Sequence, residues 1–374
     1  MHIEKLQLQN FRNYRQLDLA LDRYLNFFTG ENAQGKTNLL ESLVFAASGR
    51  SFRTRNDSEL IFWEENACSV AVNLYRQRGR EKISIGCRKD SARKNYYVNG
   101  VAAPRSDYLG RLLYVLFVPD DLAVVKGTPR LRRDFFDSLI AKVYPVYEHL
   151  TGRYLRIVRQ RNKLLRDYGP RALGSSELAS WNEQLVVQGA KIIRKRLYVL
   201  HRLSLLARLA HRRLTGGTES LKLSYCIGCL PEEKVREAEI EEQLQAVIKE
   251  LAAEEARLGQ TLAGPHRDDF IFSVNGRNAR LYASQGQQRT ILLAVKLAEV
   301  EFIKGESGEL PVLLLDDVFS ELDAKRRNFL LENFIDRQIQ TLITGTAAAQ
   351  ELIRHRGSVF TVKSGEVHSH AARS

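Results

Sequence analysis

The sequence predicts an α/β protein interrupted by a long, mostly helical lobe. Short apolar or alternating runs typical of β-strands occur near both ends of the chain, whereas the residues between about 130 and 257 show long helical periodicity. This distribution indicates that one α/β domain is assembled from both ends of the chain. We therefore expect residues 1–129 and 258–374 to form this domain, and residues 130–257 to form an inserted helical lobe.

The N-terminal part is expected to contain strands and one helix. Apolar and polar side chains alternate, as in half-buried strands, over residues 6–8, 17–21, 70–74 and 83–85. Asn99 and Gly100 are typical of a tight hairpin turn. Within residues 25–49, an apolar strand runs into a loop bounded by glycines and then into a helix that ends near Gly49. This segment is a βα unit.

The later parts of the chain show both helical and strand patterns. We expect, in chain order, helices over 146–167, 185–214 and about 232–256, a strand over 270–274, a helix from about Gln285, and a strand over 311–315.

Composition excludes several classes of protein. Apolar residues make up 44% of the chain and charged residues 27%, near the averages for globular proteins, which excludes wholesale disorder. No apolar run approaches the roughly 18 residues that can span a bilayer, and the charged N-terminus lacks the apolar stretch of a signal peptide. We therefore expect a cytoplasmic protein without membrane contact.

The net charge of +13 is concentrated in one segment. Residues 150–213 contain fifteen lysines and arginines but only three aspartates and glutamates. A solvated helical face, or a bundle in which basic helices flank an acidic one, would also be basic, but the excess favours nucleic acid binding. The candidate DNA-binding residues are Arg153, Arg156, Arg159, Lys191, Arg194 and Lys195.

Residues 30–37 fit the pattern G-x-x-x-x-G-K-[ST] of a phosphate-binding P-loop. The glycines let the backbone wrap a polyphosphate, whose oxygens bind backbone N–H groups and the positive N-terminal end of the following helix. Lys36 would reach the β- and γ-phosphates, and the hydroxyl of Thr37 would ligate Mg²⁺. The candidate ATP-binding residues are Gly30, Glu31, Asn32, Ala33, Gln34, Gly35, Lys36 and Thr37.

Two acidic residues follow the predicted strand at 311–315. An apolar run of this kind is typical of a fully buried parallel strand, whose C-terminal end meets the nucleotide in P-loop proteins. Asp316 is therefore the candidate Mg²⁺ ligand, together with Thr37. Asp317 is a candidate catalytic residue that polarises the attacking water, and Lys36 is the other catalytic candidate. Without the P-loop, a pair of aspartates capping a turn would be a reasonable alternative.

Residues 281–289, LYASQGQQR, resemble the signature segment of the ATP-binding-cassette (ABC) superfamily, in which a Ser, a Gly and a Gln open a helix. The resemblance implies that Ser284, Gly286 and Gln287 bind the γ-phosphate of a nucleotide held by the opposite subunit. Alone, Ser284 would be an ordinary helix N-cap. Together, the three motifs predict a P-loop NTPase of the ABC-ATPase head type, with a mixed sheet and helices.

Further blocks of sequence narrow the resemblance. They are QNFRNYRQLDLAL at 9–21, SGRSFRT at 48–54, FVPDDLAVVKGTPRLRRDFFD at 117–137, GPHRDD at 264–269 and DDVFSELD at 316–323. Their order and spacing resemble the RecF family of DNA replication and repair ATPases, which belongs to the SMC/Rad50-like branch of the ABC superfamily. The resemblance implies an ATP-dependent homodimer that binds single- and double-stranded DNA and works with RecO and RecR to load recombinase.

The same resemblance assigns a D-loop and predicts its place at the dimer interface. The D-loop residues are Ser320 and Asp323. Asp317 stands where most ABC ATPases have Glu, and Thr344, Gly345 and Thr346 occupy the position where a switch His is usual. Both departures predict weak ATP hydrolysis that resets a slow ATP-gated clamp, and the family resemblance implies that DNA stimulates it.

Other protein classes fit the sequence less well. A P-loop kinase or GTPase would lack the SQGQQ segment, and this chain lacks the N-K-x-D motif that reads a guanine base. A cassette importer subunit would not explain the basic helical lobe, and an SMC-like cohesion protein would need a long coiled coil. His266, between Pro265 and Arg267, is expected to be a packed turn residue instead of a ligand contact.

Overall fold

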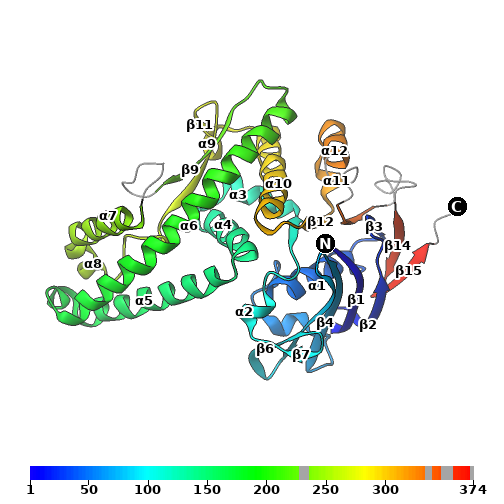
Figure 1. Cartoon of the computed structure of the whole chain (residues 1–374), viewed down its shortest axis with the longest axis horizontal. Helices are drawn as coiled ribbons and strands as arrows, with labels where there is room; N and C mark the ends of the chain where they lie inside the picture. Colours follow the sequence, from blue (N-terminus) through cyan, green and yellow to red (C-terminus); the bar gives the residue numbers. More distant parts are fainter. Residues whose placement is uncertain (227–235, 333–338, 347–356, 371–374) are drawn as a thin grey trace. The chain divides into compact units, whose positions relative to one another are not determined.

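The computed structural model describes residues 1–226, 236–332, 339–346 and 357–370, which form two compact units (Figure 1). The first unit comprises Met1–Asp121 and Glu299–Ser374, and the second comprises Leu122–Ala298. The sequence predicted boundaries after residues 129 and 257. In the structure, the two units divide after Asp121 and after Ala298. Within these ranges, the structure does not describe the side chains of Ala92, Ser320, Glu321 and His370.

Residues 258–298 belong to the second unit. Strand β10 (Asp269–Val274) pairs antiparallel with β9 (Leu221–Cys226), which follows the long helices of that unit. The guanidinium of Arg132 also donates to both carboxylate oxygens of Asp269, each at 2.7 Å. The signature segment therefore lies in the second unit, whereas the P-loop lies in the first.

The first unit contains two six-stranded sheets. The antiparallel sheet has the order β2 (Tyr14–Ala20), β1 (His2–Phe11), β4 (Ala67–Arg76), β5 (Gly79–Arg88), β6 (Ser91–Val98), β7 (Val101–Ala102). The other sheet has the order β15 (Glu366–His370), β14 (Ser358–Lys363), β3 (Leu25–Thr29), β13 (Thr341–Gly345), β12 (Val312–Asp316), β8 (Tyr114–Phe117). Within the second sheet only the β14–β15 pair is antiparallel. This sheet contains the two strands that precede the P-loop and the acidic pair.

Helix α1 (Lys36–Ser48) forms much of the core of the first unit. Its residues from Leu39 to Ala47 are all buried, and the apolar ones among them share one cluster with both sheets. Gly49 ends the helix in a left-handed conformation, φ 69°, and donates its backbone N–H to the carbonyl of Phe45. The predicted end of the helix is therefore confirmed. Among the described residues, the short helices of this unit include η1 (Asp57–Leu60), α2 (Arg105–Tyr108), η2 (Pro119–Asp121), α11 (Val318–Glu321) and α12 (Ala324–Leu330).

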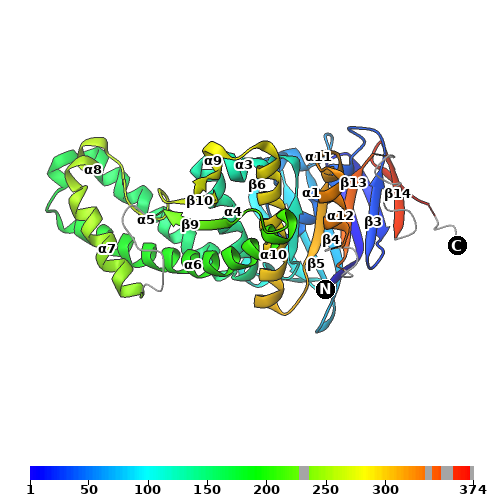
Figure 2. The ribbon, with the colours of Figure 1, turned by 90° about the horizontal axis from the view of Figure 1, so that it is seen from above.

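The second unit is mostly helical and contains one small antiparallel sheet, in the order β11-β10-β9. Its longest helices, α5 (Val146–Tyr168) and α6 (Ser176–Thr215), run side by side (Figures 1 and 2). The remaining elements are α3 (Leu122–Lys126), α4 (Pro129–Val143), η3 (Gly169–Ala172), α7 (Glu237–Glu250), α8 (Ala252–Leu258), β11 (Arg277–Asn278), α9 (Ala279–Tyr282) and α10 (Gln285–Ser307), which continues into the first unit. The helices predicted over 146–167 and 185–214 are thus present, whereas the described part of the one predicted near 232–256 is divided into α7 and α8.

Buried arginines hold the interior of the second unit together. Arg196 of α6 donates to both carboxylate oxygens of Asp137, at 2.9 and 2.7 Å, and to the carbonyl of Pro265 at 2.6 Å. Beside it, the rings of Phe136 and Phe270 stack with their centroids 3.8 Å apart.

No helix among the described residues has the length and apolar composition needed to cross a membrane.

Candidate nucleotide-binding site and basic groove

The P-loop backbone takes a shape that requires glycine at two positions. At Gly30, φ is 147° and an added Cβ would lie 2.3 Å from the carbonyl oxygen of Val362. At Gly35, φ is 118° and a Cβ would lie 2.6 Å from Nδ2 of Asn13. The loop therefore closes tightly between the end of β3 and the start of α1, so its backbone N–H groups can approach phosphate oxygens. All eight predicted ATP-binding residues lie in this loop and the first turn of α1.

Lys36 folds back over the loop that it follows. Its Nζ donates to the carbonyls of Gly30 at 2.6 Å and Glu31 at 2.8 Å. Burial lowers the pKa of Lys36, and the nearby carboxylates of Asp317 and Asp316 oppose that shift. The cation is therefore held at the mouth of the loop, where a polyphosphate could replace the two carbonyls as its partner.

Asp316 joins the two motifs of the first unit. It ends the fully buried strand β12 and is itself only 8% exposed. Its Oδ1 accepts hydrogen bonds from the hydroxyl of Thr37 at 2.9 Å and from the hydroxyl of Thr344 at 2.6 Å. A hydroxyl and a carboxylate side by side suit Mg²⁺, which commonly takes one or two protein oxygens and completes its shell with water and phosphate. The described residues contain no cluster of three or more His, Cys, Asp or Glu side chains that would make a full protein cage.

Asp317 differs from Asp316 in its surroundings. Its side chain is exposed and its backbone is left-handed, with φ of 50°. Its backbone N–H donates to the hydroxyl of Thr344 at 3.0 Å. Thr344, which stands at the usual switch position, thus contacts both acidic residues. Of the two predicted D-loop residues, Asp323 caps α12 by accepting from the backbone N–H of Arg326 at 2.9 Å, and the side chain of Ser320 lies outside the described residues.

Residues from the β1–β2 hairpin support the P-loop. The amide of Asn13 donates to the carbonyl of Gln34 at 2.9 Å and accepts from Asn38 at 2.8 Å. The hydroxyl of Tyr14 donates to the carbonyl of Gly35 at 3.0 Å, and burial raises the pKa of Tyr14, which keeps it a neutral donor. Sequence patterns assigned no role to Asn13 or Tyr14, although both lie in a block that carried the family resemblance.

A buried acid on α1 ties two further blocks to the site. Glu41 is fully buried and accepts two hydrogen bonds from Arg12, at 2.9 and 2.6 Å. The hydroxyl of Ser51 donates to the same carboxylate at 2.5 Å, and Arg53 donates to Oδ1 of Asn38 at 2.7 Å. The block at 48–54 therefore fastens the exposed side of α1.

The signature segment forms a reciprocal cap at the start of α10. The backbone N–H of Gln287 donates to the hydroxyl of Ser284 at 3.2 Å, and the backbone N–H of Ser284 donates to Oε1 of Gln287 at 2.9 Å. This is a capping box, so the N-cap that Ser284 alone would predict is present. Ser284 itself is exposed.

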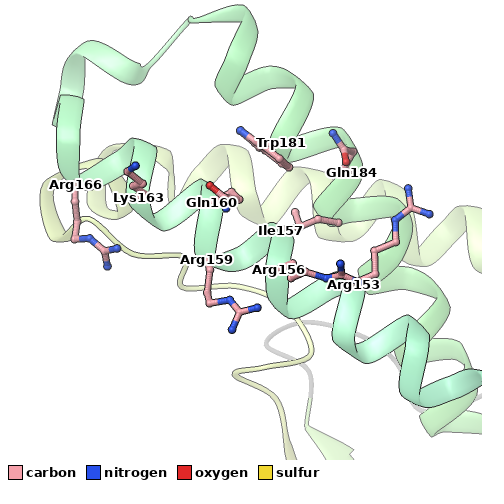
Figure 3. A pocket seen from close by; sticks show the side chains of 9 residues that line it. All are labelled: Arg153, Arg156, Ile157, Arg159, Gln160, Lys163, Arg166, Trp181 and Gln184. Atoms are coloured by element: carbon pink, nitrogen blue, oxygen red, sulfur yellow. The ribbon is translucent and has the colours of Figure 1, made fainter. Parts of the chain in front are cut away.

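A basic groove lies between α5 and α6 (Figure 3). Ile157 of α5 and Trp181 of α6 lie between the helices. Five cations line it on the α5 side, and within the described part of the chain none of them pairs with a carboxylate. They are Arg153, Arg156, Arg159, Lys163 and Arg166. Three of the predicted DNA-binding residues therefore lie in one groove.

The other three predicted DNA-binding residues have different surroundings on α6. Arg194 pairs with Glu237 of α7 at 2.8 Å. The Nζ of Lys195 lies 3.3 Å from the ring centroid of Tyr144, so part of its charge is already satisfied by an aromatic face. Lys191 is exposed but does not line the groove. The structure thus divides the six residues into two groups.

His266 is a packed turn residue, as predicted. Its Nδ1 lies 2.7 Å from the hydroxyl of Tyr154, and its Nε2 lies 3.3 Å from the carbonyl of Thr261. Burial is the main cause that lowers the pKa of His266 to about 4. A neutral ring, with Tyr154 donating to Nδ1, satisfies both contacts.

Known proteins resemble this chain over both units. The family model for the RecF/RecN/SMC N-terminal domain matches residues 2–367. The DNA replication and repair protein RecF of Natranaerobius thermophilus is 40% identical over 381 residues, covering 98% of this chain and 97% of the relative. The protein of the same name from Halothermothrix orenii is 43% identical over 352 residues, covering 92% of each.

Solved structures show the same relationship. The recombination mediator protein RecF with ATP, from the RecFOR pathway, is 32% identical to this chain, with a TM-score of 0.91 over 99% of this chain and 98% of the other. An SMC head bound to the C-terminal winged-helix domain of ScpA has a TM-score of 0.56 at 16% identity, which is a likeness of fold. The fold is therefore that of an ABC-ATPase head.

Proposed function

The chain belongs to the RecF family, and on this premise we propose that it is an ATP-dependent DNA-binding protein of recombinational repair and replication restart. ATP would join two copies into a dimer that binds DNA at single-stranded gaps and duplex junctions. RecO and RecR would act with this dimer to load recombinase, and slow hydrolysis would reset it. Membership of this family argues against the other functions considered from the sequence, which were a P-loop kinase, a GTPase and an importer subunit.

The contact between Thr37 and Asp316 carries the nucleotide part of the proposal. It brings the P-loop and the acidic strand together from positions far apart in the chain. The two oxygens would hold Mg²⁺, which when bound would neutralise phosphate charge. Lys36, released from the carbonyls of Gly30 and Glu31, would bind the β- and γ-phosphates.

Hydrolysis would depend on the exposed carboxylate of Asp317. An acid at this position can orient and polarise the attacking water. Aspartate is one methylene shorter than the glutamate of most ABC ATPases, so its carboxylate reaches less far. Slow hydrolysis suits a switch whose main task is to hold DNA while ATP is bound.

DNA binding is supported by the unpaired cations of the basic groove. Surface cations are commonly balanced by carboxylates on neighbouring turns, but the five cations that line the α5 side have none in the described part of the chain. A polyanion would supply the missing partners and release counterions. The acidic helix α7 pairs with Arg194 and does not balance the groove.

ATP-dependent dimerisation tests the proposal directly. Light scattering should show the wild-type chain passing from monomer to dimer on addition of ATP and Mg²⁺, and gapped DNA should lower the ATP concentration required, because coupling is reciprocal. Ser284→Arg should bind ATP as a monomer but fail to dimerise, because this residue acts on the opposite subunit's nucleotide. A chain that stays monomeric with ATP and DNA would refute the proposal, and a normal Ser284→Arg dimer would refute the signature role.

A further inference from the structure

The signature segment is tied to the end of the longest helix by one acidic side chain. Helix α6 ends at Thr215, and Gly216 and Gly217 turn the chain with positive φ before β9 begins. Glu219 lies in this connection. Its Oε1 accepts a hydrogen bond of 2.8 Å from Nε2 of Gln287, the signature glutamine of α10.

This contact gives the nitrogen of the Gln287 side-chain amide a hydrogen-bond partner, as its oxygen already has. The Oε1 of Gln287 already accepts from the backbone of Ser284, and its backbone N–H donates to the Ser284 hydroxyl. An amide held at both its oxygen and its nitrogen has one orientation. Glu219 therefore fixes the side chain that closes the cap around Ser284.

On its other side, Glu219 faces a buried histidine. The Nε2 of His211, in the last turns of α6, lies 3.6 Å from Oε2 of Glu219. His211 is fully buried, and neither ring nitrogen makes a hydrogen bond with the described residues. Burial lowers the pKa of His211, which favours a neutral ring. The carboxylate thus lies between the body of α6 and the signature segment.

We propose that Glu219 is a positioning residue for Gln287, so that the C-terminal end of α6 sets the geometry of the ATP signature segment. The inference rests on the proposed function, because the signature acts only in an ATP-bound dimer. At about 1.5 Å per residue, the 40 residues of α6 span about 60 Å. Its N-terminal part carries Trp181 and Gln184 of the basic groove. One continuous helix therefore links a candidate DNA contact to the residue that holds the signature.

Hydrogen exchange on the nucleotide-free protein tests the link without relying on ATP. Glu219→Ala should speed exchange of the backbone amide of Gln287, because the cap loses the support of its side chain. Glu219→Gln, whose amide oxygen can still accept, should exchange as the wild type does. Glu183→Ala, an exposed acid on α6, is the matched control. Unchanged exchange in Glu219→Ala would overturn the inference, whether or not ATP dimerises the wild type.

Nucleotide assays separate positioning from a merely structural role. Glu219→Ala should bind ATP at the P-loop normally but lower kcat by about tenfold, the loss expected for one hydrogen bond to a charged group. Glu219→Gln should restore most of kcat, and neither variant should change KM for ATP. Faster exchange without any loss of kcat or dimerisation would also overturn the proposal. A wild-type chain that does not dimerise with ATP would contradict the proposed function, and the exchange result would still decide whether Glu219 holds Gln287.

Discussion

The polar side chains of the P-loop region and those of the basic groove differ in whether they have partners within the protein. Around the P-loop, Asn13, Thr37 and Lys36 already have hydrogen-bond partners within the protein. In the groove, five cations have no carboxylate partner among the described residues. A nucleotide would therefore replace hydrogen bonds that the P-loop residues already make within the protein, whereas a polyanion would give the groove cations the anionic partners that the described residues do not provide. Paired groups should determine stability and orientation, and unpaired groups should determine affinity for a charged ligand.

Helix α5 contains both kinds of group on its two faces. Arg161, on the inner face, is 1% exposed and donates to Glu255 at 2.5 Å, to Thr261 at 2.9 Å and to Asn182 at 2.7 Å. Arg159, two residues earlier, is exposed in the groove. The same residue type on one helix thus offers a matched test.

The largest effect is expected from Arg161→Met. Removing this guanidinium leaves the fully buried carboxylate of Glu255 without its charge partner, which should lower the free energy of unfolding by about 3–5 kcal/mol. Arg159→Met should change it by less than about 0.5 kcal/mol, since the side chain is exposed and has no carboxylate partner among the described residues. Urea unfolding of both variants measures the difference. Equal stability losses would show that the two faces of α5 do not differ as described.

The buried face of the same lobe should also make stability depend on pH. His266 has a folded pKa of about 4 and an unfolded pKa near 6.5, so the unfolded chain binds more protons between these values. Its contribution is therefore complete above about pH 6.5 and is lost as the pH falls towards 4, by about 3 kcal/mol in all. His266→Gln should remove this component. The difference in unfolding free energy between wild type and variant, followed from pH 7 to 4.5, isolates it from the carboxylates; a constant difference would contradict the assignment.

The contribution of the P-loop region to ATP affinity can be tested with Lys36→Met. The substitution removes the cation that would bind the phosphates, so ATP affinity should fall on the order of 100-fold, as for the loss of a strong charged hydrogen bond. The melting temperature should change little, because Lys36 is only partly buried and contacts loop carbonyls. Titration calorimetry with ATP and Mg²⁺ is the appropriate measurement. If Lys36→Met bound ATP with wild-type affinity, residues 30–37 would not be the phosphate-binding loop.

The parts of the fold that depend on neighbouring residues were accessible from the sequence. The P-loop, the end of α1 at Gly49, the turn at Asn99 and Gly100 and the start of α10 at Gln285 all follow from local patterns. The fully buried strand before Asp316 follows from its unbroken apolar run. In each case the residue type and the backbone conformation are linked within a few positions of the chain.

Contacts between distant segments were not accessible in the same way. Nothing local to Asn13 shows that its amide holds the carbonyl of Gln34, and nothing local to Glu219 shows that it faces Gln287. Charge counting likewise grouped Arg153 with Arg194, although the structure pairs Arg194 with Glu237 and leaves Arg153 in the groove. Net charge describes a segment, whereas a binding surface depends on which charges tertiary partners have already neutralised.

In the proposed ATP-bound dimer, the groove cations of both copies of α5 should bind DNA as one surface. The salt dependence of DNA affinity, measured with and without ATP, tests it most directly, because log affinity falls with log salt by about 0.9 for each phosphate neutralised on duplex DNA. We predict a steeper slope with ATP, and a slope reduced by about 3 per protomer after Arg153, Arg156 and Arg159 are all changed to Glu. Arg194→Met, which removes an already paired cation, should change the slope least. A slope that does not depend on ATP, or one that is the same in the triple variant, would show that the α5 cations do not form an ATP-dependent DNA-binding surface.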